Sequence, residues 1–278
     1  MSAKRTVRSA LRSFSKAMAR TRIGRILLEE MVNTAMARTH LVSHRGVELE
    51  FAAPNRLTDF RIETFSTKEP ETLAWIDTLP HGSVLWDVGA NVGLYSCYAA
   101  KARDCRVVAF EPSVFNLELL ARNVYLNRLT RQVTIVPLPL CERVADNTLN
   151  MTTTQWGGAL SSFGVEHGFD GELLNKVFEF RTIGVSGDEF VKKLGLPYPD
   201  YIKMDVDGIE HLILRGGHEV LKRVRGVQVE INDSFETQAQ ESRHLLEATG
   251  LHFVSKSHSE MIAGSAAFNR TFNQVWAR

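Results

Sequence analysis

The chain has 278 residues, of which 44% are hydrophobic and 23% charged, as is typical of a globular protein with one large α/β domain. Its 33 Lys and Arg nearly balance 32 Asp and Glu, which argues against a strongly basic nucleic-acid-binding protein. The three cysteines lack C-x-x-C spacing, and no apolar run reaches the ~20 residues that cross a bilayer. With no secretory signal, these features predict a cytoplasmic protein without nucleic acid as a partner.

Residues 1–28 contain eight basic residues and no acidic one. Apolar residues form one stripe of a helix at i, i+4, i+7 and i+11, namely Val7, Leu11, Phe14 and Met18. Such a helix can contact an anionic membrane, but a helix docked on the domain, a loose tail and an organelle transit peptide fit as well. We assign residues 1–38 to a basic helical extension and keep these hypotheses open.

Residues 39–80 are expected to lead into the main domain and to cover its sheet. Two short strands are predicted within Thr39–Phe51, around a turn at His44-Arg45-Gly46, and Pro54 ends them. Apolar residues from Phe60 to Ile76 have the spacing of helical pieces. The remaining residues, 81–278, are assigned to the ligand-binding domain.

The first strand of that domain is predicted at Val84–Val88, followed by a turn with Gly89, Asn91 and Gly93 and then a helix. Glycines let the backbone approach a ligand, and the first turn of a helix offers free N–H groups. The middle glycine of a dinucleotide fingerprint is missing. Asp87 would repel a pyrophosphate but attract an ammonium group. The turn therefore favours S-adenosylmethionine (SAM) over NAD.

A second acid follows the next strand. Val107–Phe110 is apolar and ends at Glu111, about 20 residues after the glycines, where an acid binds ribose hydroxyls in doubly wound folds. NAD and SAM share that ribose, so Glu111 supports the fold more than the ligand. After a third strand at Val133–Val136, the loop Pro137–Glu142 either borders an adenine or is a plain loop.

Two segments of β-type composition, Thr148–Thr154 and Val177–Val185, enclose a Gly- and Ser-rich stretch, Gln155–Gly164. Loops of this composition can be mobile lids over a substrate or ordinary surface loops. Both interpretations stay open at this point.

The second stretch with chemical potential is Tyr201–Glu210. Lys203 and Asp205 share a face of a predicted strand, and Asp205 lies at its carboxyl end, where open α/β sheets bind ligands. Asp207 and Glu210 follow, and buried acids need partners, although a helix N-terminus also favours them. The candidate bases are Asp205, Asp207 and Glu210, with Lys203 able to tune them. Asp205 is the first choice, as the base or as the residue that positions the acceptor hydroxyl.

The C-terminal part is predicted to contain a strand from Gly226, a helix over 237–249, a strand over 251–255, a hairpin connection over 257–266 and a last strand over 272–277. Residues 230–233 would face the same edge as Asp205. Asp205, Asn232 and Asp233 could therefore offer the oxygen ligands that Mg²⁺ prefers. This metal-assisted variant is an alternative, because three oxygens distant in sequence form a loose pattern.

Three stretches resemble the FkbM family of SAM-dependent methyltransferases: Asp87–Ser96, Phe110–Pro112 and Ile202–Glu210. The similarity runs from about Glu69 to Asn232. It implies a Rossmann-like class I methyltransferase fold, with a seven-stranded, mostly parallel sheet, a reversed last strand and helices on both faces. The resemblance also implies O-methylation of a sugar, glycan or secondary metabolite.

By position, the resemblance assigns SAM binding to Asp87, Gly89, Asn91, Gly93 and Glu111. It places the stretch from Lys203 to Glu210 near the methyl group. The family often has Glu where this chain has Asp207, which keeps the charge but shortens the side chain.

Two other functions remain as alternatives. An NAD-dependent dehydrogenase is opposed by Asp87 and by the missing glycine. A non-catalytic membrane-surface protein on a SAM-type fold is opposed by the acids at the pocket edge. The absence of an Asn/Asp-Pro-Pro-Tyr motif argues against amide or adenine methylation, and Cys141 lacks the Pro-Cys dipeptide of cytosine C5 enzymes.

Overall fold

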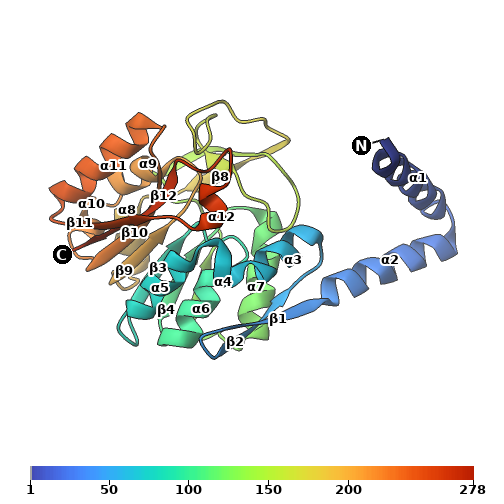
Figure 1. Ribbon diagram of the computed structural model, residues 1–278, viewed down its shortest axis with the longest axis horizontal. Helices are drawn as coiled ribbons and strands as arrows, with labels where there is room; N and C mark the ends of the chain where they lie inside the picture. Colours follow the sequence, from blue (N-terminus) through green and yellow to red (C-terminus); the bar gives the residue numbers. More distant parts are fainter. Residues whose placement is uncertain (1) are drawn as a thin grey trace.

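The computed structural model describes residues 2–278, although only the backbone is described for residues 2–5 and Arg8. A seven-stranded sheet forms its centre, with strands in the order β11-β12-β10-β9-β3-β4-β5 (Figure 1). These strands are β3 (Val84–Val88), β4 (Arg106–Phe110), β5 (Val133–Val136), β9 (Tyr201–Met204), β10 (Gly226–Asn232), β11 (His252–Ser257) and β12 (Thr271–Ala277). Strand β12 is antiparallel to β10 and β11, whereas the other pairings in this sheet are parallel. The predicted mostly parallel sheet with a reversed last strand is confirmed.

Helices cover both faces of this sheet, as predicted, because its strands are apolar on both sides. One face carries α5 (Pro70–Thr78), α6 (Leu94–Arg103) and α7 (Val114–Leu126), and the other carries α8 (Gly187–Leu194), α9 (Glu210–Arg215), α10 (His218–Leu221) and α11 (Glu236–Ala248). In β3, Trp86 points to the second face and Leu85 to the first, following the strand alternation. Trp86, Phe110 and Phe190 form a T-shaped aromatic cluster with centroids 5.0–5.7 Å apart.

The lead-in segment packs against the first face of the sheet. The predicted hairpin is present as β1 (Thr39–His44) and β2 (Val47–Ala52). Arg45 and Gly46, which join the two strands, both have positive φ. Asn123 and Asn127 of α7 bind the backbone of β2 through hydrogen bonds of 2.7–3.0 Å. The short helices α3 (Arg56–Glu63) and α4 (Phe65–Lys68) then bring the chain to α5. This segment therefore reaches the edge of the sheet where β3 ends.

An additional three-stranded antiparallel sheet follows β5, in the order β7-β6-β8. Its strands are β6 (Ala145–Met151), β7 (Ser161–Phe163) and β8 (Phe178–Gly184). The two segments of β-type composition thus form strands. The Gly- and Ser-rich stretch between them contains β7, which composition did not predict because Gly and Ser are poor strand formers.

Two details near the C-terminus differ from the expectation. The connection before the last strand is not a simple hairpin loop but contains the helix α12 (Glu260–Ala263), whose N-cap Ser259 accepts a hydrogen bond from Ile262 N–H. Strand β11 begins at His252 and extends to Ser257, two residues beyond the predicted end. Backbone pairing with β12 holds these polar residues in the strand, so the pairing outweighs their low preference for strands.

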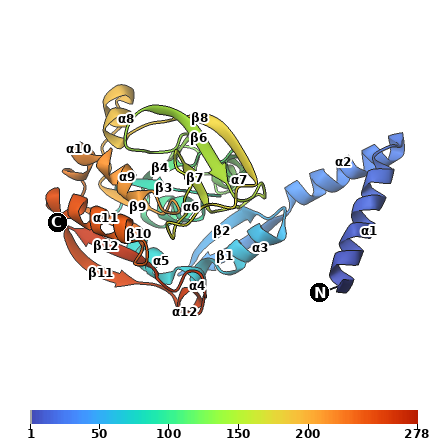
Figure 2. The ribbon, with the colours of Figure 1, turned by 90° about the horizontal axis from the view of Figure 1, so that it is seen from above.

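The N-terminal residues form two helices, α1 (Ser2–Met18) and α2 (Arg22–Ala37), that project away from the domain (Figure 2). Thr21 caps α2 by accepting a hydrogen bond of 2.9 Å from Gly24 N–H. Within residues 2–278, no helix has both the length and the hydropathy required to span a bilayer.

Candidate active site

The turn after β3 is built around glycines that hold the backbone close to the end of β9. Gly89 has φ of +82°, and a Cβ at this position would lie 1.9 Å from the carbonyl oxygen of Asp205. A Cβ at Gly93 would lie 2.3 Å from Leu120 Cδ1. A larger residue at Gly89 would displace Asp205, so this glycine positions the acid as well as the turn.

Two cavities open at the carboxyl ends of the parallel strands. The larger has a volume of about 260 Å³ and extends toward α4 and α12, with Phe65 and Ile262 in its wall. The smaller has a volume of about 70 Å³ and extends toward Glu111, with mainly apolar neighbours. The two cavities share five lining residues: Gly89, Asn91, Ala159, Asp205 and Asp207. They therefore meet at the glycine turn and the end of β9, where doubly wound folds bind ligands.

Glu111 lies beside the smaller cavity, at the end of β4. Its carboxylate accepts hydrogen bonds from Asn91 N–H at 2.7 Å and from Ser113 N–H at 2.8 Å. Burial raises the pKa of Glu111 to about 7, against the lowering effect of these two hydrogen bonds. The acid is thus fixed to the glycine turn, and its predicted contact with ribose hydroxyls stays a prediction.

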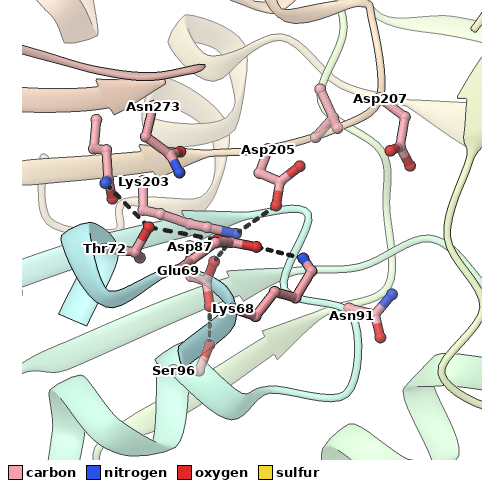
Figure 3. Close-up of polar contacts among 12 residues, drawn as sticks. Lys68, Glu69, Thr72, Asp87, Asn91, Ser96, Lys203, Asp205, Asp207 and Asn273 are labelled. Atoms are coloured by element: carbon pink, nitrogen blue, oxygen red, sulfur yellow. Dashed lines mark hydrogen bonds and ion pairs between the residues drawn. The ribbon is translucent and has the colours of Figure 1, made fainter. Parts of the chain in front are cut away.

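Lys203 lies between two carboxylates in the centre of the site (Figure 3). Its Nζ is 3.4 Å from Asp87 Oδ1 and 3.6 Å from Asp205 Oδ2. Burial lowers the pKa of Lys203, but Asp87, Asp205 and more distant acids outweigh that effect, so the pKa is raised. Lys203 therefore stays charged between its two acidic neighbours.

Asp87 is almost fully buried and lines neither cavity. Its Oδ2 accepts a hydrogen bond of 2.5 Å from Ser96 Oγ, and its Oδ1 faces Lys203. The ammonium group beside Asp87 therefore belongs to the protein. Sequence reasoning did not anticipate this pairing, because strand alternation relates Lys203 to Asp205 but not to a residue on the neighbouring strand.

Asp205 and Asp207 both line the junction of the cavities, whereas Glu210 does not. The Glu210 carboxylate accepts hydrogen bonds of 3.1 Å from both Val206 N–H and Gly208 N–H, and a further one from Gln238. Burial raises the pKa of Glu210 to about 7. Glu210 thus holds the turn that carries Asp205 and Asp207.

The segment Gln155–Leu160 crosses the junction and is held by side chains of the site. Asp207 Oδ2 accepts a hydrogen bond of 2.6 Å from Leu160 N–H, and Asn91 donates one of 2.7 Å to Gly158 O. Arg61 Nε donates one of 2.7 Å to Gly157 O. Burial and the charge of Asp205 raise the pKa of Asp207 to about 6. The segment proposed as a lid therefore lies where the cavities meet.

Several residues of the larger cavity were not among the predicted site residues: Arg61, Lys68, Glu69, Tyr95 and Glu230. Lys68 and Glu69 form an ion pair with each other. Burial opposes the ionisation of Glu69, but Lys68 and Lys203 lower its pKa to about 2. The sequence did offer one indication, since Glu230 interrupts an apolar strand and was expected at this edge.

Two of the residues considered for a magnesium site have other partners. Asn232 accepts a hydrogen bond of 2.9 Å from Ser234 N–H, and Asp233 forms an ion pair with Lys256. Within the described part of the chain, no group of three His, Cys, Asp or Glu side chains is arranged to hold a metal ion.

Residues 87–263, more than half of the chain, match the family model of the methyltransferase FkbM domain. The chain belongs to this family. The FkbM match includes the glycine turn, Glu111, the stretch from Lys203 to Glu210, and Glu230. It leaves the N-terminal helices and the hairpin outside.

Two curated relatives and one solved structure are similar to this FkbM chain. It is 30% identical over 155 residues to the hexuronic acid methyltransferase AglP of Haloferax volcanii, covering 54% of this chain and 56% of that protein. It is 28% identical over 188 residues to the AMB antimetabolite synthetase AmbE of Pseudomonas aeruginosa, covering 56% of this chain and 9% of that protein. The match thus spans about half of one relative and a small part of the other.

The solved structure is the methyltransferase FkbM from Methylobacillus flagellatus. It is similar to this chain with a TM-score of 0.51 at 13% identity, covering 80% of this chain and 52% of that one. At this identity the similarity establishes the fold.

Proposed function

We propose that this protein transfers a methyl group from SAM to a hydroxyl oxygen of a sugar, glycan or secondary metabolite. The observation that carries the proposal is the junction of two unlike cavities at the ends of β3 and β9. One cavity is mainly apolar, with Glu111 as its only acid away from the junction, and the other is lined by several charged side chains. A donor and an acceptor of different chemistry would meet at this junction.

The smaller cavity has the chemistry that the adenosine part of SAM requires. Pro112, Leu138, Leu140 and Phe163 would cover the base, and Glu111 would accept hydrogen bonds from the ribose hydroxyls. A carboxylate has about four acceptor sites, and two backbone N–H groups and the Asn116 side chain leave room on Glu111 for a further donor. When bound, SAM supplies a methyl group on a positively charged sulfur, which is open to in-line attack.

The larger cavity suits a polar acceptor. Arg61 and Lys68 stand with four carboxylates in its wall, so that donors and acceptors for several hydroxyl groups are present. The relative named as a hexuronic acid methyltransferase supports an acceptor of the sugar class. Asp205, held by Lys203, would orient the acceptor at the junction, and alignment of the reacting atoms accounts for much of the rate enhancement in such transfers.

Incubation with methyl-labelled SAM and a panel of sugars, uronic acids and simple alcohols tests this function. Mild alkali hydrolyses methyl esters but not methyl ethers, so we expect a labelled product that survives alkali. A labelled ester, or retention of NAD instead of SAM, would contradict the proposal.

Glu111→Gln removes the charge that would bind the ribose. We expect SAM affinity to fall by about 2 kcal/mol, roughly thirtyfold, in calorimetry. Glu118→Gln is the control, because Glu118 is exposed on α7 and pairs with Arg122. Equal SAM affinity in the two variants would remove Glu111 from the cofactor site.

A further inference from the structure

Glu230 stands at the edge of the larger cavity and does not line the smaller one. It belongs to β10, which is parallel to β9, and the pair Val229–Met204 precedes it in the register. Glu230 is therefore level with Asp205, on the next strand. On its other side it pairs in the antiparallel register with Asn273 of β12. A ligand in the larger cavity would have both acids along one wall.

The four carboxylates of the larger cavity differ in whether they already have hydrogen-bond or ion-pair partners within the protein. Glu69 is paired with Lys68, Asp205 with Lys203, and Asp207 with the N–H groups of Leu160 and Ser161. Among the side chains and backbone groups that the structure describes, none forms a hydrogen bond or ion pair with the carboxylate of Glu230. Its oxygens remain available to a ligand.

The charges around Glu230 favour its uncharged form. Burial raises its pKa well above the ordinary value, Asp205, Glu69 and Asp207 raise it further, and Lys68 opposes them. Lys203 is the other cation of this cluster. A carboxylate in such surroundings holds a proton more strongly than a solvated one, which makes its deprotonated form a stronger base. Glu69, with its pKa lowered to about 2, is in contrast a poor base.

We propose that Glu230 is the catalytic base that accepts the proton of the acceptor hydroxyl; this rests on the proposed methyl transfer. The hydroxyl proton moves to a carboxylate oxygen of Glu230 as the acceptor oxygen forms its bond to the methyl carbon. The bond between that carbon and sulfur breaks, and its electron pair stays on sulfur. Asp205, committed to Lys203, is then a positioning residue.

Glu230→Gln tests this assignment, with Asp233→Asn as the control. Asp233 follows the same strand but pairs with Lys256 and lines neither cavity. We expect Glu230→Gln to lower turnover by ~10²-fold or more, as is typical for loss of a general base. Wild-type turnover should rise with pH through the pKa of Glu230, because the base must be deprotonated, and the variant should lose this rise. Normal turnover with the rise retained would overturn the assignment.

A second measurement needs no acceptor. Sinefungin is a SAM analogue with a primary amine in place of the methylated sulfonium. S-adenosylhomocysteine has a neutral thioether there and thus no positive charge at that position. Glu230→Gln should weaken sinefungin about tenfold through loss of a charged contact and leave S-adenosylhomocysteine within twofold. Equal weakening of both would make Glu230 a cofactor or structural residue and overturn the proposal. If the wild-type protein binds neither compound, the proposed function itself fails.

The helices α1 and α2, here called the N-terminal arm, carry an apolar face that no described part of the domain covers. In α1, Val7, Leu11 and Phe14 are 58%, 59% and 63% exposed, and in α2 Ile23 and Met31 are 72% and 64% exposed. Both views show α1 and α2 clear of the domain (Figures 1 and 2). A helix docked on the domain would bury this face. Because the face is exposed, α1 and α2 do not adopt the docked arrangement.

The charge of the arm indicates what covers this face. Residues 1–28 include eight basic residues and no acidic one. Arg12 and Lys16 lie more than a quarter-turn from the apolar stripe by helical spacing. A second copy of the arm would bring like charges together, whereas an anionic lipid surface matches both the apolar and the basic side. We propose that α1 lies flat on an anionic membrane surface, with its apolar stripe at the acyl boundary.

Sedimentation of the full chain with lipid vesicles tests the arm. We expect binding to phosphatidylglycerol-containing vesicles at low salt, weaker binding at high salt, and little binding to pure phosphatidylcholine. Leu11→Glu should abolish sedimentation, and Leu194→Glu, at a 60% exposed position of α8, should leave it unchanged. Equal sedimentation of these two variants would contradict membrane docking. So would a dimer in solution that Leu11→Glu dissociates, because the second copy would then be the partner.

Discussion

At the scale of single residues, the site depends on which charges the protein neutralises itself. Lys203 is shared by Asp87 and Asp205, and it leaves Asp87 without a free oxygen facing the cavity. Removing one member of a buried ion pair costs ~3–5 kcal/mol, because the remaining charge stays in a poorly solvated place. The buried Lys203–Asp87 pair is therefore a fixed support, and the partly exposed Asp205 is the member able to contact a ligand.

Asp205→Asn keeps the size of the side chain and removes the charge that faces Lys203. We expect turnover to fall by ~10²-fold, because the acceptor is no longer held in line with the methyl group. SAM affinity should change little, since Glu111 and the apolar wall of the smaller cavity are unchanged. Steady-state kinetics and calorimetry separate the two effects.

Asp146→Asn serves as the control for this experiment, since Asp146 is exposed and pairs with Arg181 on the additional sheet. The pH dependence of Asp205→Asn should keep the rise assigned to Glu230. If instead SAM affinity falls and turnover at saturating SAM stays normal, Asp205 is a cofactor ligand.

At the scale of elements, the turn between β9 and α9 places two acids at the cavity junction with a third acid behind it. Asp207 has φ of +63°, a conformation that Asp tolerates better than most side chains. Gly208 has φ of +115°, and a Cβ there would lie 2.4 Å from Gly168 O. The backbone conformation of Asp207 and Gly208 thus sets the shape of the turn that carries these acids.

Glu210→Gln tests the support that this turn receives. The folded-state pKa of Glu210 is about 7, above the ordinary 4.5, so its stabilising protonated form is fully present below pH 4.5 and lost as the pH rises through 7. We expect the free energy of unfolding of the wild type to decrease between pH 5 and 7.5. The variant cannot titrate at this position, so its decrease should be smaller, by up to about 3 kcal/mol.

Chemical denaturation at pH 5, 6 and 7.5 measures this slope. Glu111 and Asp207, with pKa values raised to about 7 and about 6, also contribute to the decrease in both proteins, as does Glu230, whose pKa is raised by burial. Parallel slopes in the wild type and in Glu210→Gln would mean that Glu210 is already ionised in the folded state.

At the scale of the whole molecule, the sheet and its helices were predictable because their hydrophobic residues recur at the spacing of strands and helices. Val84–Val88 and Tyr201–Met204 are apolar strands, and the motifs after them lie at their carboxyl ends as expected. Contacts between distant segments were not predictable in the same way. Nothing in the spacing places Lys203 against Asp87 on the neighbouring strand, or Lys68 and Glu230 in one cavity.

The positions of Asp205, Asp207 and Glu210 show the same limit on a smaller scale. All three were expected near the methyl group from the resemblance to the FkbM family. The backbone turn at Asp207 and Gly208 sends the Glu210 side chain back toward Val206 and away from the cavities. Sequence order thus predicted the edge of the sheet at which the acids lie, whereas the turn geometry decided which of them a ligand can reach.

The larger cavity is enclosed by the two ends of the domain. Ile262 and Phe268 line it together with Arg61 and Phe65, and Asn273 donates a hydrogen bond of 3.0 Å to Glu71, 202 residues earlier in the chain. During synthesis on the ribosome, the glycine turn and Glu111 emerge long before these C-terminal residues. The smaller cavity can therefore form once α9 has been translated, but the larger cavity is completed only when Phe268 and the last strand have followed.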